Sequence, residues 1–308
     1  MKKVSVVLAA MLSLGSPSTI ITAPAAGAAN PPAHAYTSVT GHQRSVVSLP
    51  DICSRMDAEG LCASAGDGSR RGATGQRVPH QRAAEELIDH LNAIGWPQER
   101  KYNRYRQGQE ETIVRWGQPG RPDTYKNVSQ CASFVTETLK HTYSHWATLS
   151  FFHTHFGNYS PFARDYHDAI ANKKPIPHFR RVTKVTDLRP GDLIAIKYPE
   201  SQDFTGHVML VRRVTGREQT GPALDDATAY VVEIIDTTKA AHGRVGQSGA
   251  YRDTRITAST EETGAGYGHM VFYANNKERT FAGYRWSVTS HQIVPVDKHP
   301  IVAARITP

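Results

Sequence analysis

The chain has 308 residues, of which 39% are hydrophobic and 21% are charged, and its formal net charge is +8. This length and composition suffice for one large or two modest packed domains, and they exclude a chain that is disordered throughout. The net positive charge favours binding of the protein to anionic surfaces. A basic, soluble surface without a specific anionic partner is an equal alternative. Lys and Arg are scattered, and no basic run interleaved with aromatics marks a nucleic-acid track, so we expect no nucleic-acid partner.

The N-terminus has the pattern of a bacterial signal peptide. Lys2 and Lys3 precede an apolar run, and small residues follow up to a cleavage position after Ala28 or Ala29. We therefore predict a signal peptide at residues 1–28 and an exported protein, either periplasmic or secreted. An uncleaved membrane anchor is the alternative. Because no later apolar run is long enough to span a bilayer, we expect no stable membrane insertion after cleavage.

The three cysteines divide into a close pair and a single residue. Disulfides persist outside the cytoplasm, and Cys53 and Cys62 flank a short polar loop, so we predict a local disulfide between them. The surrounding residues 29–78 show no sustained periodicity, which predicts an irregular leader. Cys131 is left over, and an exported free thiol is either buried as a packing residue or used in chemistry.

Helical periodicity begins directly after the leader, at residue 79. Residues 80–94 carry one apolar face, which ends at Gly95 and Pro97 and is made of Ala84, Leu87, Ile88, Leu91 and Ile94. This pattern predicts the first helix of a folded domain that spans residues 79–308.

Two further helices are predicted downstream. One begins near Cys131 with Ser129 as its N-cap, which places the cysteine in the first helical turn. The other covers residues 161–171, with Ser160 as its cap and Pro161 at its first position.

From about residue 182 the pattern changes to strands and turns. The turn RPGD leads into the first of the predicted strands, which cover residues 193–198, 206–214, 229–236, 268–275, 281–288 and 301–306. Helices come first and strands afterwards, without the alternation of a parallel sheet, so the fold class is α+β.

Cys131 has the surroundings of a nucleophile. A thiol attacks as the thiolate, and both a helix N-terminus and a nearby imidazole favour that form. His207 opens a predicted strand directly after Gly206, where a small residue allows another group to approach closely. Asp236 ends the next strand and can orient the imidazole of His207. Taken alone, His207 is equally well a half-exposed strand residue, and Asp236 a residue of the turn that follows.

Four segments together resemble a known enzyme family: CASFVTETL, LRPGDLIAIKY, TGHVMLV and VVEIIDTT. Across residues 123–236 they look like the NlpC-type branch of the papain-like cysteine peptidases. The resemblance implies a papain-like, NlpC-like α+β fold, in which N-terminal helices, the nucleophile helix among them, pack on a mainly antiparallel β-sheet. It also implies Cys131 as the nucleophile, His207 as the general base, Asp236 as the orienting residue, and no cofactor.

By the same resemblance we expect an exported cysteine hydrolase that cleaves amide bonds in bacterial cell-wall peptides or in another peptide or amide substrate. Two alternatives stay open. One is a Cys-His acyltransferase, because the same residues serve acyl transfer when water is excluded. The other is a non-catalytic cell-wall or surface binding module on this scaffold. Gln130 and Ala132 favour the latter, because the family usually has an acidic residue before the cysteine and Ser-Gly after it.

The segment after Asp236 is rich in Gly, His and Arg and follows the predicted site directly. We predict that it overhangs the cleft, where His242 or Arg244 would meet a substrate carboxylate. A flexible loop without a role is the alternative. His153 and His155 form an HxH pair, but no further ligand accompanies them at suitable spacing, so we predict no metal site.

Overall fold

The computed structural model describes residues 77–172 and 174–308. All of them belong to one compact unit, Ala73–Pro308. The predicted signal peptide at residues 1–28, the leader up to residue 76 and the predicted Cys53–Cys62 disulfide lie outside the described residues, so these three features stay predictions.

Helices occupy the first half of the described chain and strands most of the second. The α-helices are α2 (Pro79–Asn92), α3 (Cys131–Thr142), α4 (Leu149–Phe156) and α5 (Ala163–Ala171), and the 3-10 helices are η2 (Gln98–Lys101), η3 (Pro122–Thr124) and η4 (Val185–Asp187). The strands are β1 (Asn103–Tyr105), β2 (Ile113–Arg115), β3 (Lys126–Ser129), β4 (Phe179–Val182), β5 (Leu193–Lys197), β6 (Gly206–Arg217), β7 (Ala227–Thr238), β8 (Gly264–Asn275), β9 (Phe281–Arg285), β10 (Val294–Pro295) and β11 (Ile301–Ile306). Among the described residues, we find no helix with the length and apolar character that a membrane crossing needs.

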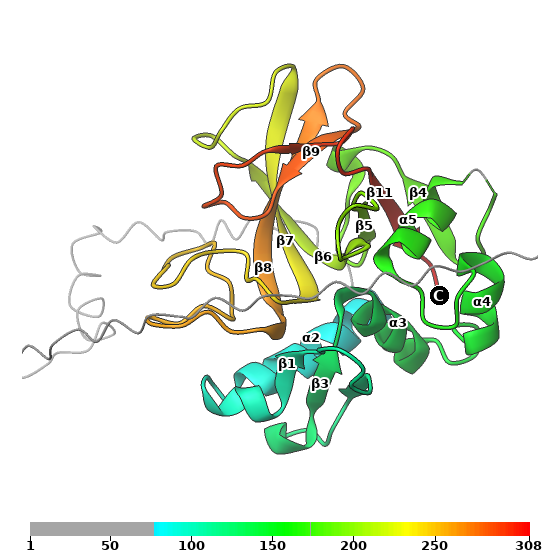
Figure 1. The fold of residues 1–308 in the computed structure, drawn as a ribbon, viewed down its shortest axis with the longest axis vertical. Coiled ribbons are helices and arrows are strands. Elements are labelled where there is room, and N and C mark those ends of the chain that lie inside the picture. The colour runs from blue at the N-terminus through cyan, green and yellow to red at the C-terminus, as the bar shows by residue number, and fades with distance from the viewer. Residues whose placement is uncertain (1–76, 173) are drawn as a thin grey trace, which may run out of the picture. The chain divides into compact units, whose positions relative to one another are not determined.

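The strands form two sheets. Eight of them make one antiparallel sheet in the order β10-β9-β8-β7-β6-β5-β11-β4. The other three make a small sheet, in which β1 runs parallel and β2 antiparallel to the central β3. Figure 1 shows the small sheet beside α2 and α3, while α5 packs on β5 and β11 and α4 lies against α5. The predicted α+β class, with helices before a mainly antiparallel sheet, is confirmed.

Both faces of the large sheet are buried at its centre. On β6, Val208 and Leu210 pack into the cluster that contains residues of α2, α3 and α5, whereas Met209 and Val211 pack into a second cluster on the other face. A strand that is buried on both faces needs apolar residues at successive positions. This explains why β6 reads as a continuous apolar run rather than as an alternating one.

Two predicted helix starts differ from the structure. Ser129 is the last residue of β3, and its hydroxyl donates to the side chain of Asn127 at 2.6 Å, so α3 is capped by Gln130 instead. The third predicted helix begins at Ala163 rather than at Pro161, because the Asp165 carboxylate accepts a hydrogen bond from the backbone N–H of Phe162 at 2.9 Å and closes the first turn there. Side-chain hydrogen bonds decide both boundaries.

Candidate active site

Cys131 is the first residue of α3 and follows directly on the small sheet. β3 is held between β1 and β2, and the turn after Ser129 delivers the cysteine to the N-terminus of α3. The backbone N–H of Gln130 donates to the hydroxyl of Ser133 at 2.9 Å, which fixes this turn. The first N–H groups of a helix have no partner within the helix, so the N-terminus of α3 favours negative charge on its first residue, Cys131. Cys131 is buried, and it is a free thiol in the part of the chain that the structure describes.

His207 stands at the start of β6, close to this thiol. Its neighbour Gly206 has a φ of +140°, and a Cβ atom there would lie 2.0 Å from the carbonyl oxygen of Ile196. The strand can therefore begin in this position only with glycine. Burial by itself lowers the pKa of His207, but the charge of Cys131 and hydrogen bonds with Asp236 and Cys131 outweigh burial and raise the pKa to about 9.

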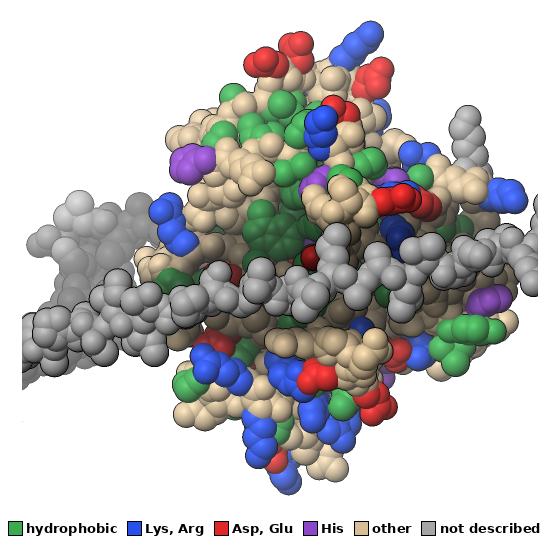
Figure 2. Space-filling view, viewed as in Figure 1, with side chains coloured by type: hydrophobic (Ala, Val, Ile, Leu, Met, Phe, Trp, Pro, Cys, Tyr) green, Lys and Arg blue, Asp and Glu red, His purple; other side chains and the backbone are tan. Residues whose placement is uncertain are grey.

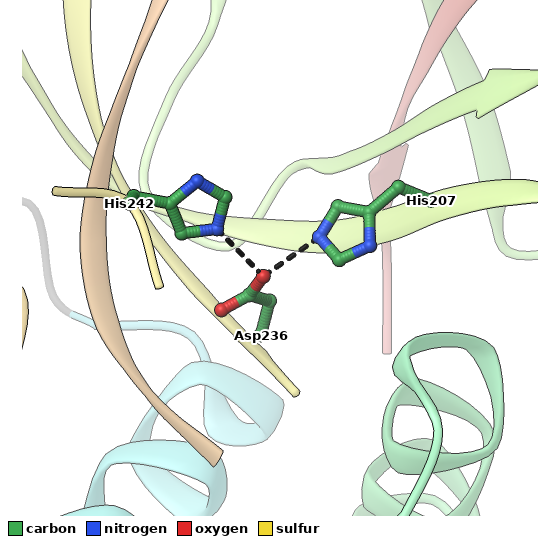
Figure 3. Close-up of side chains that lie close together, drawn as sticks. All are labelled: His207, Asp236 and His242. Atoms are coloured by element: carbon green, nitrogen blue, oxygen red, sulfur yellow. Dashed lines mark hydrogen bonds and ion pairs between the residues drawn. The ribbon is translucent and has the colours of Figure 1, made fainter. Parts of the chain in front are cut away.

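Asp236 lies near the end of β7 and is fully buried. The ladder between β6 and β7 includes the pair Leu210 and Ile235, and beyond this pair the side chains of His207 and Asp236 join the two strands. Nε2 of His207 donates to Oδ2 of Asp236 over 2.7 Å (Figure 3). The other ring nitrogen of His207 points away from Asp236 in this view, so it is available to interact with the thiol of Cys131.

Asp236 has two further partners. Nε2 of His242 lies 2.9 Å from the same oxygen, Oδ2, and the Arg255 guanidinium donates to Oδ1 at 2.8 Å. Burial alone would raise the pKa of Asp236, but the charges of Arg255 and His242 and the two histidine hydrogen bonds hold it well below its usual range. Asp236 is therefore an anion at neutral pH, and the orientation of its carboxylate is fixed on both oxygens.

His242 and Arg255 are themselves held on their far sides. Nδ1 of His242 lies 2.7 Å from the backbone carbonyl of Trp286, and Arg255 makes a two-pronged contact with Asp253 at 2.8 and 2.9 Å. His242, Arg255 and Asp253 are fully buried. We call Asp236, His242, Asp253 and Arg255 the buried charge network. A carbonyl and a carboxylate can only accept hydrogen bonds, so His242 satisfies both neighbours when both of its ring nitrogens carry a proton.

Strand β8 makes room for this network with glycines. A Cβ atom on Gly266 would lie 2.9 Å from Nε of Arg255, and one on Gly268 would lie 2.5 Å from Oδ2 of Asp253 and 2.6 Å from the His242 ring. These two glycines are two positions apart, so they face the same side of the strand. The sequence GAGYGH therefore provides a surface without side chains on which the network lies.

The site opens into a cavity of about 320 Å³. Its walls come from the small sheet, from the loop before β6, from the end of β7 and from the residue after β9. The lining residues are Tyr105, Cys131, Tyr198, Phe204, Gly206, His207, Thr238, Lys239, Ala240 and Trp286. The edge of one ring faces the plane of the other between His207 and Trp286, whose centroids are 5.0 Å apart. Figure 2 shows hydrophobic side chains near the middle of the face that it views, and Lys and Arg mixed with acidic residues below.

The structure brings Cys131, His207 and Asp236 together, as the sequence pattern predicted. It places His242 against Asp236 but not in the cavity lining, and it places Arg244 outside that lining. His242 has no exposed surface, and both of its ring nitrogens are engaged, so it is not open to a substrate. Arg244 is exposed and is not among the described residues that line the cavity. The segment after Asp236 does reach the cavity, but through Thr238, Lys239 and Ala240.

Sequence reasoning did not find Arg255, Asp253 or Trp286. The spacing Asp-x-Arg at residues 253–255, within the segment already noted for its Gly, His and Arg content, was the available signal for the first two. Trp286 lies in a predicted strand, where an aromatic residue is common and gives no sign of a second role.

His207, Asp236 and His242 also have the composition of a metal site, since one ligand atom of each lies within 4.8 Å of the others. However, Asp236 already accepts hydrogen bonds from both histidines and from a buried guanidinium. A divalent cation at this place would lie beside the positive charge of Arg255 and would replace the protons that connect the ring nitrogens to Oδ2. The contacts of these residues fit hydrogen bonding better than metal coordination.

The chain is similar to an uncharacterized protein of Acanthamoeba polyphaga mimivirus: the identity is 29% over an alignment of 204 residues, and the match covers 63% of this chain and 84% of the viral protein. No protein-family model and no solved structure matches the chain.

Proposed function

We propose that this protein is a cysteine hydrolase that cleaves amide bonds through Cys131, His207 and Asp236. The observation that carries the proposal is the constellation itself: a free thiol at a helix N-terminus lines the same cavity as a histidine, and Nε2 of that histidine is bound by a buried carboxylate. Each group has the partner that nucleophilic catalysis requires.

In this mechanism the sulfur of Cys131 attacks the amide carbonyl carbon, and a C–S bond forms. The negative charge on the carbonyl oxygen is stabilised by N–H groups of the first turn of α3. His207, protonated at both ring nitrogens, donates a proton to the amide nitrogen, and the C–N bond breaks to leave a thioester and a free amine. His207 then takes a proton from water, whose oxygen displaces the sulfur and releases the carboxylic acid. Asp236 keeps the His207 ring in the required orientation throughout.

The resemblance to NlpC-type papain-like peptidases supports this proposal at the level of fold and residue order. A cysteine helix packs on an antiparallel sheet, and His207 and Asp236 follow on neighbouring strands. On the same basis we propose an exported protein, in the periplasm or outside the cell, with bacterial cell-wall peptides as the first substrates to examine. The mimivirus relative has no stated activity with which the proposal can be compared.

The direct test compares wild-type protein with Cys131→Ala and Cys131→Ser on purified cell wall and on a set of peptide amides. We expect the release of new amino groups by wild-type protein only, while circular dichroism shows that all three proteins are folded. Cleavage that persists in Cys131→Ala excludes this nucleophile. Added hydroxylamine separates hydrolysis from acyl transfer, because an acyltransferase forms the hydroxamate in preference to the free acid.

The non-catalytic alternative is tested by alkylation with iodoacetamide. A thiolate paired with the imidazolium of His207 reacts at nearly the same rate from about pH 6 to about pH 8. An ordinary thiol loses about tenfold in rate per pH unit below its pKa of about 8.5. Peptide mass analysis assigns the label to Cys131 and separates it from Cys53 and Cys62. A steep loss of rate, or no reaction in the folded protein, favours a packing role and a binding module.

A further inference from the structure

We propose that the cavity beside Cys131 takes substrates that carry a large apolar group and a carboxylate near the scissile amide, and that Lys239 recognises the carboxylate. The inference rests on the proposed function, whose substrate class it narrows. It follows from the chemistry of the cavity walls and not from the predicted cell-wall substrate.

The walls of the cavity are aromatic. Tyr105, Tyr198, Phe204 and Trp286 come from three separate segments, because Tyr198 and Phe204 share the connection between β5 and β6, and all four line the cavity with Cys131. Phe204 is 46% exposed, which leaves a large apolar ring at the cavity mouth with much of its surface in water. Aromatic walls of this kind bind flat or apolar groups and gain free energy by removing both surfaces from water. The apolar part of the substrate is therefore expected between these rings.

Lys239 is the one Lys or Arg among the described residues that line the cavity. It is exposed, and its Nζ lies 4.8 Å from the ring centroid of Phe204 and 5.7 Å from that of Tyr105. The two rings hold the ammonium at the wall without neutralising its charge. An ammonium placed over apolar rings at a cavity mouth is suited to a carboxylate, because the rings exclude part of the competing water.

Apart from the thiolate of Cys131, which is paired with the imidazolium of His207 in the proposed mechanism, the cavity has no negative side chain among its described lining residues. No Asp or Glu is present among the described residues that line it. Asp236 lies behind His207, is fully buried and is neutralised by Arg255 and the histidines. The N-terminus of α3 and the imidazolium of His207 both add positive potential. An amine on the substrate would find no carboxylate among the described lining residues, and the Cys131 thiolate is already paired with His207, so the cavity disfavours cationic substrates.

The test uses the reactivity of Cys131 and needs no known substrate. Three aromatic iodoacetamides of similar size differ in one para substituent: a carboxylate, a neutral carboxamide and a trimethylammonium group. In each reaction the sulfur displaces iodide, so that a C–S bond replaces the C–I bond. Second-order rate constants for Cys131, divided by those of the same reagents with a small free thiol, measure recognition by the cavity.

We expect the carboxylate reagent to react with wild-type Cys131 about tenfold faster than the trimethylammonium reagent at low salt, and we expect this preference to shrink in high salt. Lys239→Met should reduce the preference to about twofold or less, and Lys239→Glu should reverse it. Arg244→Met is the matched control, because it removes a nearby exposed cation that lies outside the cavity, and it should keep the wild-type preference.

Equal rates for the three reagents, or a preference that survives in Lys239→Met, overturn the inference about the substrate while the nucleophile stands. If the neutral aromatic reagent reacts no faster than iodoacetamide itself, after the same correction, the aromatic walls do not bind and the apolar part of the inference is wrong. If Cys131 reacts with none of the reagents in the folded protein but with all of them after unfolding, both the inference and the proposed function are excluded.

Discussion

His207 and His242 share one acceptor, the Oδ2 atom of Asp236, at 2.7 and 2.9 Å. Only His207 faces the cavity, whereas His242 lies behind the carboxylate and also binds the backbone of Trp286. His242 thus connects Asp236 to the residue whose ring packs against His207. We interpret it as a positioning residue that acts on the candidate site through Asp236 and Trp286.

Replacement of His242 should therefore lower the reactivity of Cys131, although His242 is not one of the residues that line the cavity. For His242→Gln we expect a several-fold lower rate of alkylation near neutral pH, because one hydrogen bond to Asp236 or to the Trp286 carbonyl is weakened. Asp236→Ala should have a larger effect, since it removes the partner of both histidines. An unchanged rate in His242→Gln, in a protein of wild-type stability, contradicts the positioning role.

Arg255→Met should destabilise the fold strongly. The substitution leaves Asp236 and Asp253 buried without their shared guanidinium, and breaking a buried ion pair in this way costs about 3–5 kcal/mol. Urea unfolding followed by circular dichroism measures the loss. Arg121→Met, which removes a surface pair with Asp123, is the control and should leave the unfolding midpoint unchanged. Similar midpoints for both variants would show that Arg255 contributes little.

The pKa of His207 should fall when Cys131 is replaced. It is raised from 6.5 to about 9, and the charge of Cys131 is the largest of the influences that raise it against burial. In Cys131→Ala that charge is gone, so the imidazolium should lose its proton at a lower pH than in wild-type protein. An NMR titration of the His207 ring nitrogens follows this directly. A midpoint that does not move would mean that the thiol and the imidazole do not interact.

Gly206→Ala should destabilise the protein more than Gly216→Ala does. Both glycines lie on β6 and have similar φ angles, +140° and +137°, so an alanine is equally strained at either position. A Cβ atom would contact backbone only at Gly206, where it would lie 2.0 Å from the carbonyl oxygen of Ile196. We expect a difference of about 1–3 kcal/mol between the variants in urea unfolding. Equal losses would show that the start of β6 can shift.

Removal of metal ions should leave Cys131 unaffected. Asp236 is surrounded by the proton donors of two histidines and by Arg255, and these contacts occupy the atoms that a cation would need. Dialysis against EDTA or 1,10-phenanthroline should change neither the alkylation rate nor the unfolding midpoint, and elemental analysis should find no stoichiometric metal. A chelator-sensitive midpoint restored by zinc would instead favour a metal centre at these three residues.

Much of the large sheet could be predicted from the sequence because its strands are long and apolar. The strand predicted at residues 301–306 agrees with β11, and β6 and β7 extend only slightly beyond their predicted ends. β1 and β3 were not predicted, because each has only a few residues and owes its form to its neighbours: Asn103 and Asn127 are fully buried polar residues bonded to each other. The hydrophobic pattern of a short segment does not indicate such pairing between residues that are distant in sequence.

The candidate site also contains some residues that the sequence predicts and others that it does not. Cys131, His207 and Asp236 were predicted because each stands at the start or end of a regular element with a recognisable pattern. His242 was singled out from its segment, but the segment folds inward at that residue, where Asp253 accepts a hydrogen bond from its backbone N–H at 2.8 Å. The direction in which a loop turns depends on partners distant in sequence, and Arg255 and Asp253 are such partners. Composition alone cannot indicate that direction.

The glycines of β8 limit the substitutions that the protein tolerates. Gly266 and Gly268 have no reactive group and lie outside every motif of the candidate site. Yet the space above them is filled by Arg255, Asp253 and His242, so that a single added methyl group would displace a buried charge. Variation at these two positions should therefore be as restricted as at Asp236 itself, and a survey of functional variants should find them nearly invariant, although neither takes part in the chemistry.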